Sequence, residues 1–333
     1  MQGKFLLLLF LISTPTTADI DINVSFPEPE TNEEEFGMPK IYHQINDYVS
    51  QLNISRNPDD VRFFLYNKLD PNISHELFLN DQQSFQNSPF DPNQKTVLLI
   101  HGFWTNGSSP MPTNLRKAFM ESGSRSNIII VNWGLLSTPV PRVLQHKPFS
   151  YPIVVPRKNP HHRTLTGCSY CGSVGRTLSA FPENGGRKVA RITGLDPARR
   201  YFTDSAAQKL TSDAANFVDI YYTAAGSMGI PTLTDGHVNF IPNGGHHQPG
   251  CLDPTNPFFG GEAEFGGCSH DVVHRIYAAS ITRNITACEC EPELAKIMKC
   301  PVNCTDSILA GERCPTSARG LYYFETDKNY YTE

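Results

Sequence analysis

Asp196 has the residue type and the setting of a group that orients a catalytic histidine. It follows the run Ile192-Thr-Gly-Leu195 and precedes a proline, as expected at the carboxyl end of a strand. A carboxylate at that edge of a parallel sheet faces the crevice in which such folds bind ligands. There it can orient a histidine and stabilise the imidazolium that forms when the histidine takes a proton. Capping of the following segment is the alternative role of this aspartate.

His270 follows a loop that two cysteines can close. Cys251 and Cys268 bracket 16 residues, many of them Gly, Pro and Phe, and Ser269 and His270 come directly after them. A disulfide would fix the residue beside it, which suits a catalytic base that must keep one orientation. The loop also carries three aromatic side chains, at Phe258, Phe259 and Phe265. They indicate either an apolar lid for a lipid surface or a segment buried against the body of the protein.

The stretch Ile100-His-Gly-Phe103 places a glycine directly after an apolar run. In a hydrolase this position supplies a backbone N–H to an oxyanion hole, because the glycine allows a sharp turn that directs the next amide at a developing negative charge. A plain turn at the end of a strand is the alternative interpretation.

Short apolar runs predict the strands that position these residues. Such runs fit strands buried on both faces of a mostly parallel sheet. They lie at Val61–Tyr66, Thr96–Ile100, Ile128–Trp133, Val189–Thr193 and Val218–Tyr222. Helical composition at Thr113–Ser122 and Asp204–Ala214 alternates with them. This order predicts the α/β class with a doubly wound sheet.

One region departs from this alternation. Residues 135–163 contain six prolines, a density that excludes a continuous helix between two parallel strands. We therefore expect residues 135–185 to be irregular within a domain that covers residues 46–333.

The N-terminal residues predict export. Lys4, an apolar run from Phe5 to Ile12 and small residues up to Ala18 have the organisation of a signal peptide over residues 1–18. Residues 19–45 are expected to be a flexible acidic extension. Six Asn-x-Ser/Thr sequons, at Asn23, Asn53, Asn72, Asn106, Asn284 and Asn303, agree with a secreted, extracellular glycoprotein. The net charge of −5 provides no basic stripe, so nucleic acid is not an expected partner.

The nine cysteines favour disulfides in an exported chain, and their odd number leaves at least one without an intramolecular partner. Besides Cys251 with Cys268, we expect Cys304 to pair with Cys314, and Cys300 to pair with either Cys288 or Cys290. Zinc binding by the five C-terminal cysteines is the less favoured alternative, because their spacing is irregular and no histidine lies among them. These cysteines are Cys288, Cys290, Cys300, Cys304 and Cys314. No metal or cofactor is expected.

Six motifs resemble those of the pancreatic lipase family, especially its insect lipase and phospholipase A1-like members. They are Ile100-His-Gly-Phe103, Val131-Asn-Trp-Gly134, Arg191-Ile-Thr-Gly-Leu-Asp-Pro-Ala198, Gly236-His-Val-Asn-Phe-Ile-Pro-Asn-Gly-Gly245, Pro249-Gly-Cys251 and Gly267-Cys-Ser-His270. The resemblance runs from about residue 60 to Thr326, with an interruption at 135–185. It implies an α/β-hydrolase fold with Asp196 as triad acid, His270 as triad base, the Phe103 N–H as an oxyanion donor and the loop between Cys251 and Cys268 as the lid.

The nucleophile of this family is a serine in a Gly-x-Ser-x-Gly elbow. Here Gly167-Cys-Ser169-Tyr170-Cys171 places Ser169 27 residues before Asp196, but Cys171 stands where the second glycine belongs. Under this alignment Ser169 is the nucleophile and the Tyr170 N–H is the second oxyanion donor. A redox role of the Cys168-x-x-Cys171 pair is disfavoured, because no thioredoxin-like context surrounds it.

A second alignment removes the nucleophile. Ser173 to Phe181 resembles the helix that precedes the elbow in insect members, which would mean that the elbow and the strand before it are absent. An incomplete gene model of an active lipase would explain both that absence and the proline-rich insert. The alternatives are therefore an active Ser-His-Asp hydrolase and a damaged or divergent copy of one.

The resemblance implies a secreted lipid carboxylester hydrolase, a lipase or phospholipase A1, that acts in lipid catabolism at a lipid interface. Its short lid favours the phospholipase A1 type. The chain ends soon after the family's closing strand, which implies no C-terminal β-sandwich domain and no colipase partner, and we expect a monomer. The alternative function is an inactive lipid-binding or storage protein, like the yolk proteins of flies.

Overall fold

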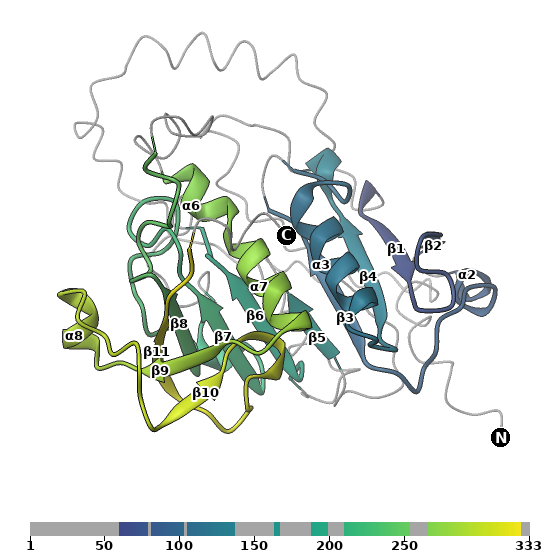
Figure 1. Cartoon of the computed structure of the whole chain (residues 1–333). Helices are drawn as coiled ribbons and strands as arrows, with labels where there is room; N and C mark the ends of the chain where they lie inside the picture. Colours follow the sequence, from purple (N-terminus) through teal and green to yellow (C-terminus); the bar gives the residue numbers. More distant parts are fainter. Residues whose placement is uncertain are drawn as a thin grey trace, which may run out of the picture.

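The computed structural model describes residues 60–78, 81–102, 105–136, 163–166, 188–198, 210–253 and 266–327, and for 163–166 it describes the backbone alone. These residues build an 11-stranded sheet in the order β10-β9-β11-β8-β7-β6-β5-β3-β4-β1-β2 (Figure 1). In the described part of the chain, no helix is long and apolar enough to span a membrane. The segments expected to be a signal peptide and an acidic extension lie outside the described residues.

Seven neighbouring strands form the parallel centre of the sheet. In spatial order they are β4 (Asn127–Asn132), β3 (Thr96–Ile100), β5 (Arg163–Thr166), β6 (Arg191–Leu195), β7 (Phe217–Tyr221), β8 (Val238–Pro242) and β11 (Gly320–Phe324). Antiparallel strands complete the two edges: β1 (Arg62–Tyr66) and β2 (His75–Leu77) beside β4, and β9 (Thr286–Glu289) and β10 (Ser307–Leu309) beside β11. The expected parallel sheet therefore forms the centre of a mixed sheet.

Both faces of the central strands are buried. In β3, Val97 and Leu99 belong to one apolar cluster, whereas Leu98 and Ile100 belong to the cluster on the opposite face. This explains the uninterrupted apolar runs of the sequence, because a strand covered on both sides has no solvent-facing positions.

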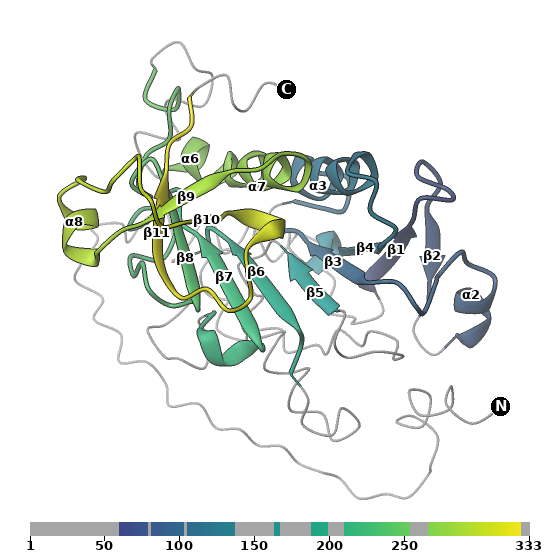
Figure 2. The same cartoon turned by 60° about the horizontal axis from the view of Figure 1, so that its bottom comes forward.

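Two helices cover the same face of the sheet. Helix α3 (Pro110–Glu121) and helix α7 (Val273–Thr282) pack against each other there (Figures 1 and 2). Helix α3 begins three residues before the expected start, with a proline in its first turn, where no backbone N–H is needed. Of the second expected helix only the end is described, as the 3₁₀ turn η6 (Ser212–Ala214). The shorter helices and turns are α2 (Gln82–Gln86), η2 (Gly134–Leu136), α6 (Gly267–Asp271), α8 (Pro292–Lys296) and η7 (Gly311–Arg313).

The two alignments differ in whether a strand precedes the elbow, and the structure contains such a strand, β5. Residues Arg163–Thr166 pair in parallel with β3 on one side and with β6 on the other. The interpretation in which this central strand is absent is therefore wrong. The sequence pattern did not predict this strand because its residues are mostly polar. Polar residues can still form a strand, since the hydrogen bonds between strands use only the backbone.

The C-terminal disulfides differ in part from the expected pairs. Cys290 is joined to Cys300, one of the two alternatives, but Cys304 is joined to Cys288. The expected pair of Cys304 with Cys314 is wrong, because β10 pairs with β9 in a register that returns the chain to Cys288. Cys314 is a free thiol, buried in the apolar cluster under α7. That burial raises the pKa of the Cys314 thiol to about 12.

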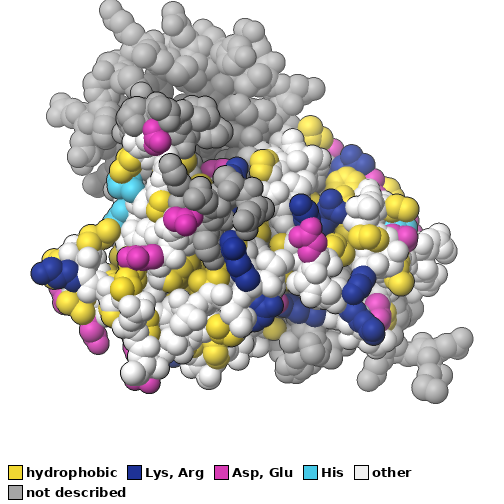
Figure 3. Space-filling view, in the orientation of Figure 1, with side chains coloured by type: hydrophobic (Ala, Val, Ile, Leu, Met, Phe, Trp, Pro, Cys, Tyr) yellow, Lys and Arg dark blue, Asp and Glu magenta, His cyan; other side chains and the backbone are white. Residues whose placement is uncertain are grey.

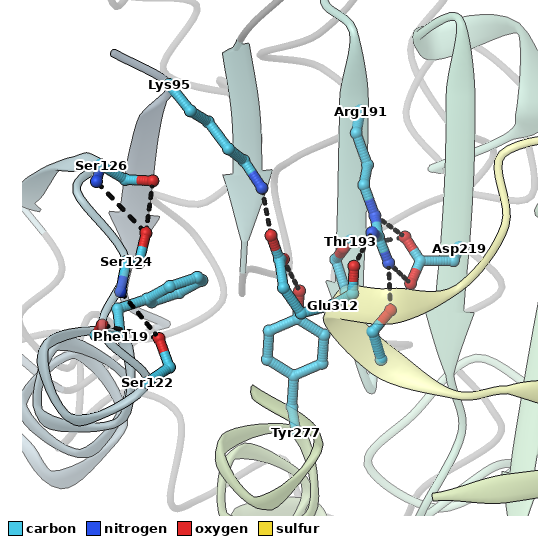
Figure 4. Close-up of polar contacts among 11 residues, drawn as sticks. Lys95, Phe119, Ser122, Ser124, Ser126, Arg191, Thr193, Asp219, Tyr277 and Glu312 are labelled. Carbon is cyan, nitrogen blue, oxygen red and sulfur yellow. Dashed lines mark hydrogen bonds and ion pairs between the residues drawn. The ribbon is translucent and has the colours of Figure 1, made fainter. Parts of the chain in front are cut away.

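A buried ionic cluster ties the C-terminal segment to the sheet (Figure 4). Arg191 makes two hydrogen bonds to the Asp219 carboxylate, from Nε (2.9 Å) and Nη2 (2.7 Å). The same guanidinium donates to the backbone carbonyls of Gly311 (2.7 Å) and Glu312 (3.1 Å). The Glu312 side chain in turn binds Lys95 and accepts from the Tyr277 hydroxyl. Strands β6 and β7, together with Lys95 directly before β3, are thereby held to η7.

Large apolar side chains are exposed around α8, which lies at the left of Figure 1; at this edge Figure 3 shows hydrophobic side chains beside charged ones. They are Leu294, Ile297, Met298 and Val302. The disulfides of Cys290 with Cys300 and of Cys288 with Cys304 bracket this segment.

Candidate functional site

The side chains of Asp196 and His270 meet although their positions in the chain differ by 74. The Nδ1 atom of His270 lies 2.6 Å from Oδ2 of Asp196. Asp196 follows the last residue of β6, and His270 belongs to α6, which lies at the upper end of the strands in the view of Figure 1. The Asp196 side chain is fully buried, whereas 27 % of the His270 side chain is exposed. The pair therefore has one buried carboxylate and one accessible imidazole.

Backbone amides hold the Asp196 carboxylate from the other side. Its Oδ1 atom accepts hydrogen bonds from the N–H groups of Thr223 (2.8 Å) and Ala224 (3.0 Å). Its backbone has a positive φ of 44°, an uncommon conformation for a residue with a side chain. A Cβ atom at Gly229 would lie 2.5 Å from Oδ1, so this space exists only because position 229 is a glycine.

The carboxylate decides the state of the His270 ring. Because a carboxylate only accepts hydrogen bonds, Nδ1 carries the hydrogen of the pair and Nε2 is left to take a proton. Burial lowers the pKa of His270, but the hydrogen bond and the charge of Asp196 outweigh burial, so that this pKa lies above its ordinary value. His270 thus has the tautomer and the increased basicity of a general base.

The short helix α6 fixes His270 in place. Its N-cap is Gly266, which has a left-handed φ of 70° and lies so close to Ser227 that a Cβ atom there would be 2.2 Å from the Ser227 Oγ. Cys268 is joined to Cys251 by a disulfide. The loop expected to be a lid lies between them, and its residues 254–265 are outside the described residues. The role of this loop as a lid stays a prediction.

His101 organises the loop in which the oxyanion donor was expected. The ring stacks on Trp133, with centroids 5.3 Å apart, and its Nε2 accepts a hydrogen bond from the Trp133 backbone N–H (3.1 Å). Its Nδ1 donates to the Gly102 carbonyl (2.9 Å). Burial lowers the pKa of His101, which favours the neutral ring that these contacts require. Phe103 itself lies outside the described residues.

The remaining predicted site residues also lie outside the described residues. They are Ser169 and Tyr170, together with the neighbouring Cys168 and Cys171. Strand β5 ends at Thr166, three residues before Ser169, and it is the direct neighbour of β6, after which Asp196 follows.

Sequence reasoning missed the groups that hold the acid. Thr223 and Ala224 act through backbone N–H groups, which every residue except proline has, so their residue types carried no signal. Gln248 was missed too, although it lies between two of the quoted motifs. The buried Gln248 side chain donates a hydrogen bond to the Thr223 carbonyl.

Known proteins resemble the chain in sequence. The family described as Lipase matches residues 34–142 and 165–307. Pancreatic lipase-related protein 2 of Bos taurus is 30% identical over 248 residues, which cover 68% of this chain and 52% of that protein. Lipase member H of Danio rerio is 27% identical over 290 residues, covering 80% and 62%. Inactive pancreatic lipase-related protein 1 of Homo sapiens is 29% identical over 252 residues, covering 66% and 51%. The chain thus spans about half the length of most of these relatives.

Proposed function

Because the chain belongs to the lipase family, whose fold is that of the α/β-hydrolases, we propose that it hydrolyses carboxylic esters of lipids by acyl transfer. The observation that carries this proposal is the hydrogen bond of 2.6 Å between His270 Nδ1 and Asp196 Oδ2. It prepares the opposite ring nitrogen to take a proton from a nucleophile, as in other Ser-His-Asp hydrolases.

Ser169 is the proposed nucleophile. The family match resumes at residue 165, inside β5, and therefore includes Ser169. Ser169 follows Thr166, the last residue of β5, by three positions in the sequence, and three residues span at most about 11 Å. Asp196 directly follows the neighbouring strand β6, and the carboxyl ends of parallel strands share one edge. The triad can therefore assemble at this edge.

The proposed reaction proceeds in two stages. His270 Nε2 takes the proton of the Ser169 hydroxyl while the serine oxygen attacks the ester carbonyl, and the backbone N–H groups of Phe103 and Tyr170 bind the oxyanion. The alcohol leaves with the proton from His270, and an acyl-enzyme remains. Water, deprotonated by His270, then releases the fatty acid and restores the serine.

We propose a phospholipid or a triacylglycerol as the substrate, met at a lipid interface by a secreted monomer. The phospholipase A1 type is favoured by the length of the loop between Cys251 and Cys268. Three disulfides support an oxidising, extracellular location. Release of fatty acid from vesicles of defined phospholipid and from emulsified triacylglycerol would rank the two substrates.

A fluorophosphonate probe tests the proposal, because it reacts only with an activated serine. We expect one adduct, mapped by mass spectrometry to the peptide that contains Ser169. Ser169→Ala should abolish the adduct, whereas Ser173→Ala, a matched change four residues further on, should retain it. An adduct on another serine would overturn the assignment of Ser169.

A catalytically inactive lipid-binding or storage protein is the second candidate function. The relative that bears the word inactive in its name favours it, since it matches the chain almost as well as the others do. Folded protein that binds lipid vesicles, yet forms no adduct and releases no fatty acid, would support this candidate against the hydrolase.

A further inference from the structure

Gln248 connects the two segments that bind the opposite sides of the Asp196 carboxylate. Oδ1 is bound by the backbone of Thr223 and Ala224, and Oδ2 is bound by His270 of α6. These partners come from different parts of the chain, so their spacing decides whether the carboxylate can satisfy both. Gln248 is 2 % exposed and forms hydrogen bonds to both segments.

The side-chain amide of Gln248 holds the first segment. Its Nε2 donates to the carbonyl of Thr223 (3.1 Å) and to that of Pro242, the last residue of β8 (3.1 Å). Its Oε1 accepts from Nδ2 of Asn243 (2.8 Å). The residue that donates to Asp196 from its N–H is therefore held through its own carbonyl to the end of β8. Both amide hydrogens of Gln248 are used, which leaves the side chain a single orientation.

The backbone of Gln248 holds the second segment. Its N–H donates to Oγ of Ser269 (2.9 Å), and its carbonyl accepts from the N–H of Cys251 (3.1 Å). Ser269 is fully buried and directly precedes His270, and Cys251 is joined to Cys268 of the same helix. A movement of Gln248 would therefore move α6 relative to Thr223.

We propose that Gln248 is a positioning residue that sets the distance between the amides that bind Asp196 and the helix that carries His270. The expected effect on the reaction rate rests on the proposed acyl transfer. The expected effect on the position of His270 relative to Asp196 does not. An error of about 1 Å in such a distance can lower a rate by about 100-fold. Gln248 acts through Thr223 and Ser269 and touches neither substrate nor the reacting atoms in this assignment.

The test replaces Gln248 by methionine, which has the same length and no amide. We expect Gln248→Met to slow the fluorophosphonate reaction by about 10- to 100-fold. In protein with ¹⁵N-labelled histidine rings, we also expect the titration midpoint of His270 to fall, because the Asp196 carboxylate no longer meets Nδ1 at the same distance. The titration does not depend on a nucleophile. If the unmodified protein does not react with the probe, the proposed function fails and the titration alone decides about Gln248.

Asn127→Leu is the matched control. Asn127, the first residue of β4, also has a buried side-chain amide. This amide forms two hydrogen bonds with the backbone of Asp91. Its loss should lower stability and leave the His270 midpoint unchanged.

Ser269→Ala removes the other partner of the bridge and leaves the Gln248 side chain intact. We expect it to slow the reaction in the same direction, and the double variant to be slowed by less than the product of the two single effects, since both changes break one connection. A His270 midpoint and a reaction rate that stay as in the unmodified protein in both folded single variants would overturn the proposal.

Discussion

The Asp196 carboxylate receives hydrogen bonds from two backbone N–H groups and from one imidazole. This arrangement resembles an orienting acid, since the amides fix the carboxylate and the carboxylate fixes the ring tautomer. The positive φ of Asp196 and the glycine at position 229 are the local costs of this geometry. Both features concern the backbone, so they could not be predicted from the chemistry of the carboxylate.

Asp196→Asn tests this role. We expect kcat for ester hydrolysis to fall by about 10⁴-fold with little change in KM, because an amide supports the wrong tautomer of His270. Asp271→Asn is the matched control, since this neighbour of His270 has a side chain that is 57 % exposed. Its kcat should stay close to that of the unmodified protein. Equal losses in the two variants would contradict the role of Asp196.

Among single residues, the resemblance to the lipase family named Asp196 and His270 as a pair, and their side chains meet in the structure. The disulfide of Cys251 with Cys268 was expected from the loop that these cysteines bracket. The amides of Thr223 and Ala224 could not be named, because backbone groups are the same in every residue but proline. Gln248 could not be named either, since its role depends on where two distant carbonyls lie.

At the scale of elements, apolar runs identified the strands that are buried on both faces, such as β3 and β4. Strand β5 was ambiguous because Arg163-Thr-Leu-Thr166 is polar and only four residues long, and its neighbours rather than its own side chains place it in the sheet. Cysteine pairing failed for Cys304 because it depends on the register between β9 and β10, which the spacing of cysteines does not encode.

The buried cluster joins elements and supplies the stability prediction. Arg191→Met leaves the fully buried Asp219 carboxylate without its cation, so we expect the free energy of unfolding in urea to fall by about 3–5 kcal/mol. Arg62→Met is the control, because the exposed pair of Arg62 with Glu76 should contribute little. Similar effects of both changes would show that burial of the Arg191 pair is not what matters.

At the scale of the whole molecule, the candidate site and the stabilising ionic cluster lie at opposite ends of the strands of the sheet. Strand β6 carries Arg191 of the ionic cluster at its start and is followed at its other end by Asp196. The C-terminal segment is fastened at the first end, and helix α6 brings His270 to the second. The α/β class was predictable from the alternation of strands and helices. The antiparallel edges were not, because short strands such as β2 and β10 lack a distinct pattern.

The pH dependence of the fluorophosphonate reaction at Ser169 is the most direct test of the account. The reaction requires unprotonated His270, so its rate should be low in acid and rise as the pH passes the pKa of His270. Because Asp196 raises that pKa, the midpoint should lie above the ordinary histidine value of 6.5, and Asp196→Asn should lower both the midpoint and the plateau. A rate that does not change across this range, or that is the same in Asp196→Asn, would contradict a triad built on Asp196 and His270.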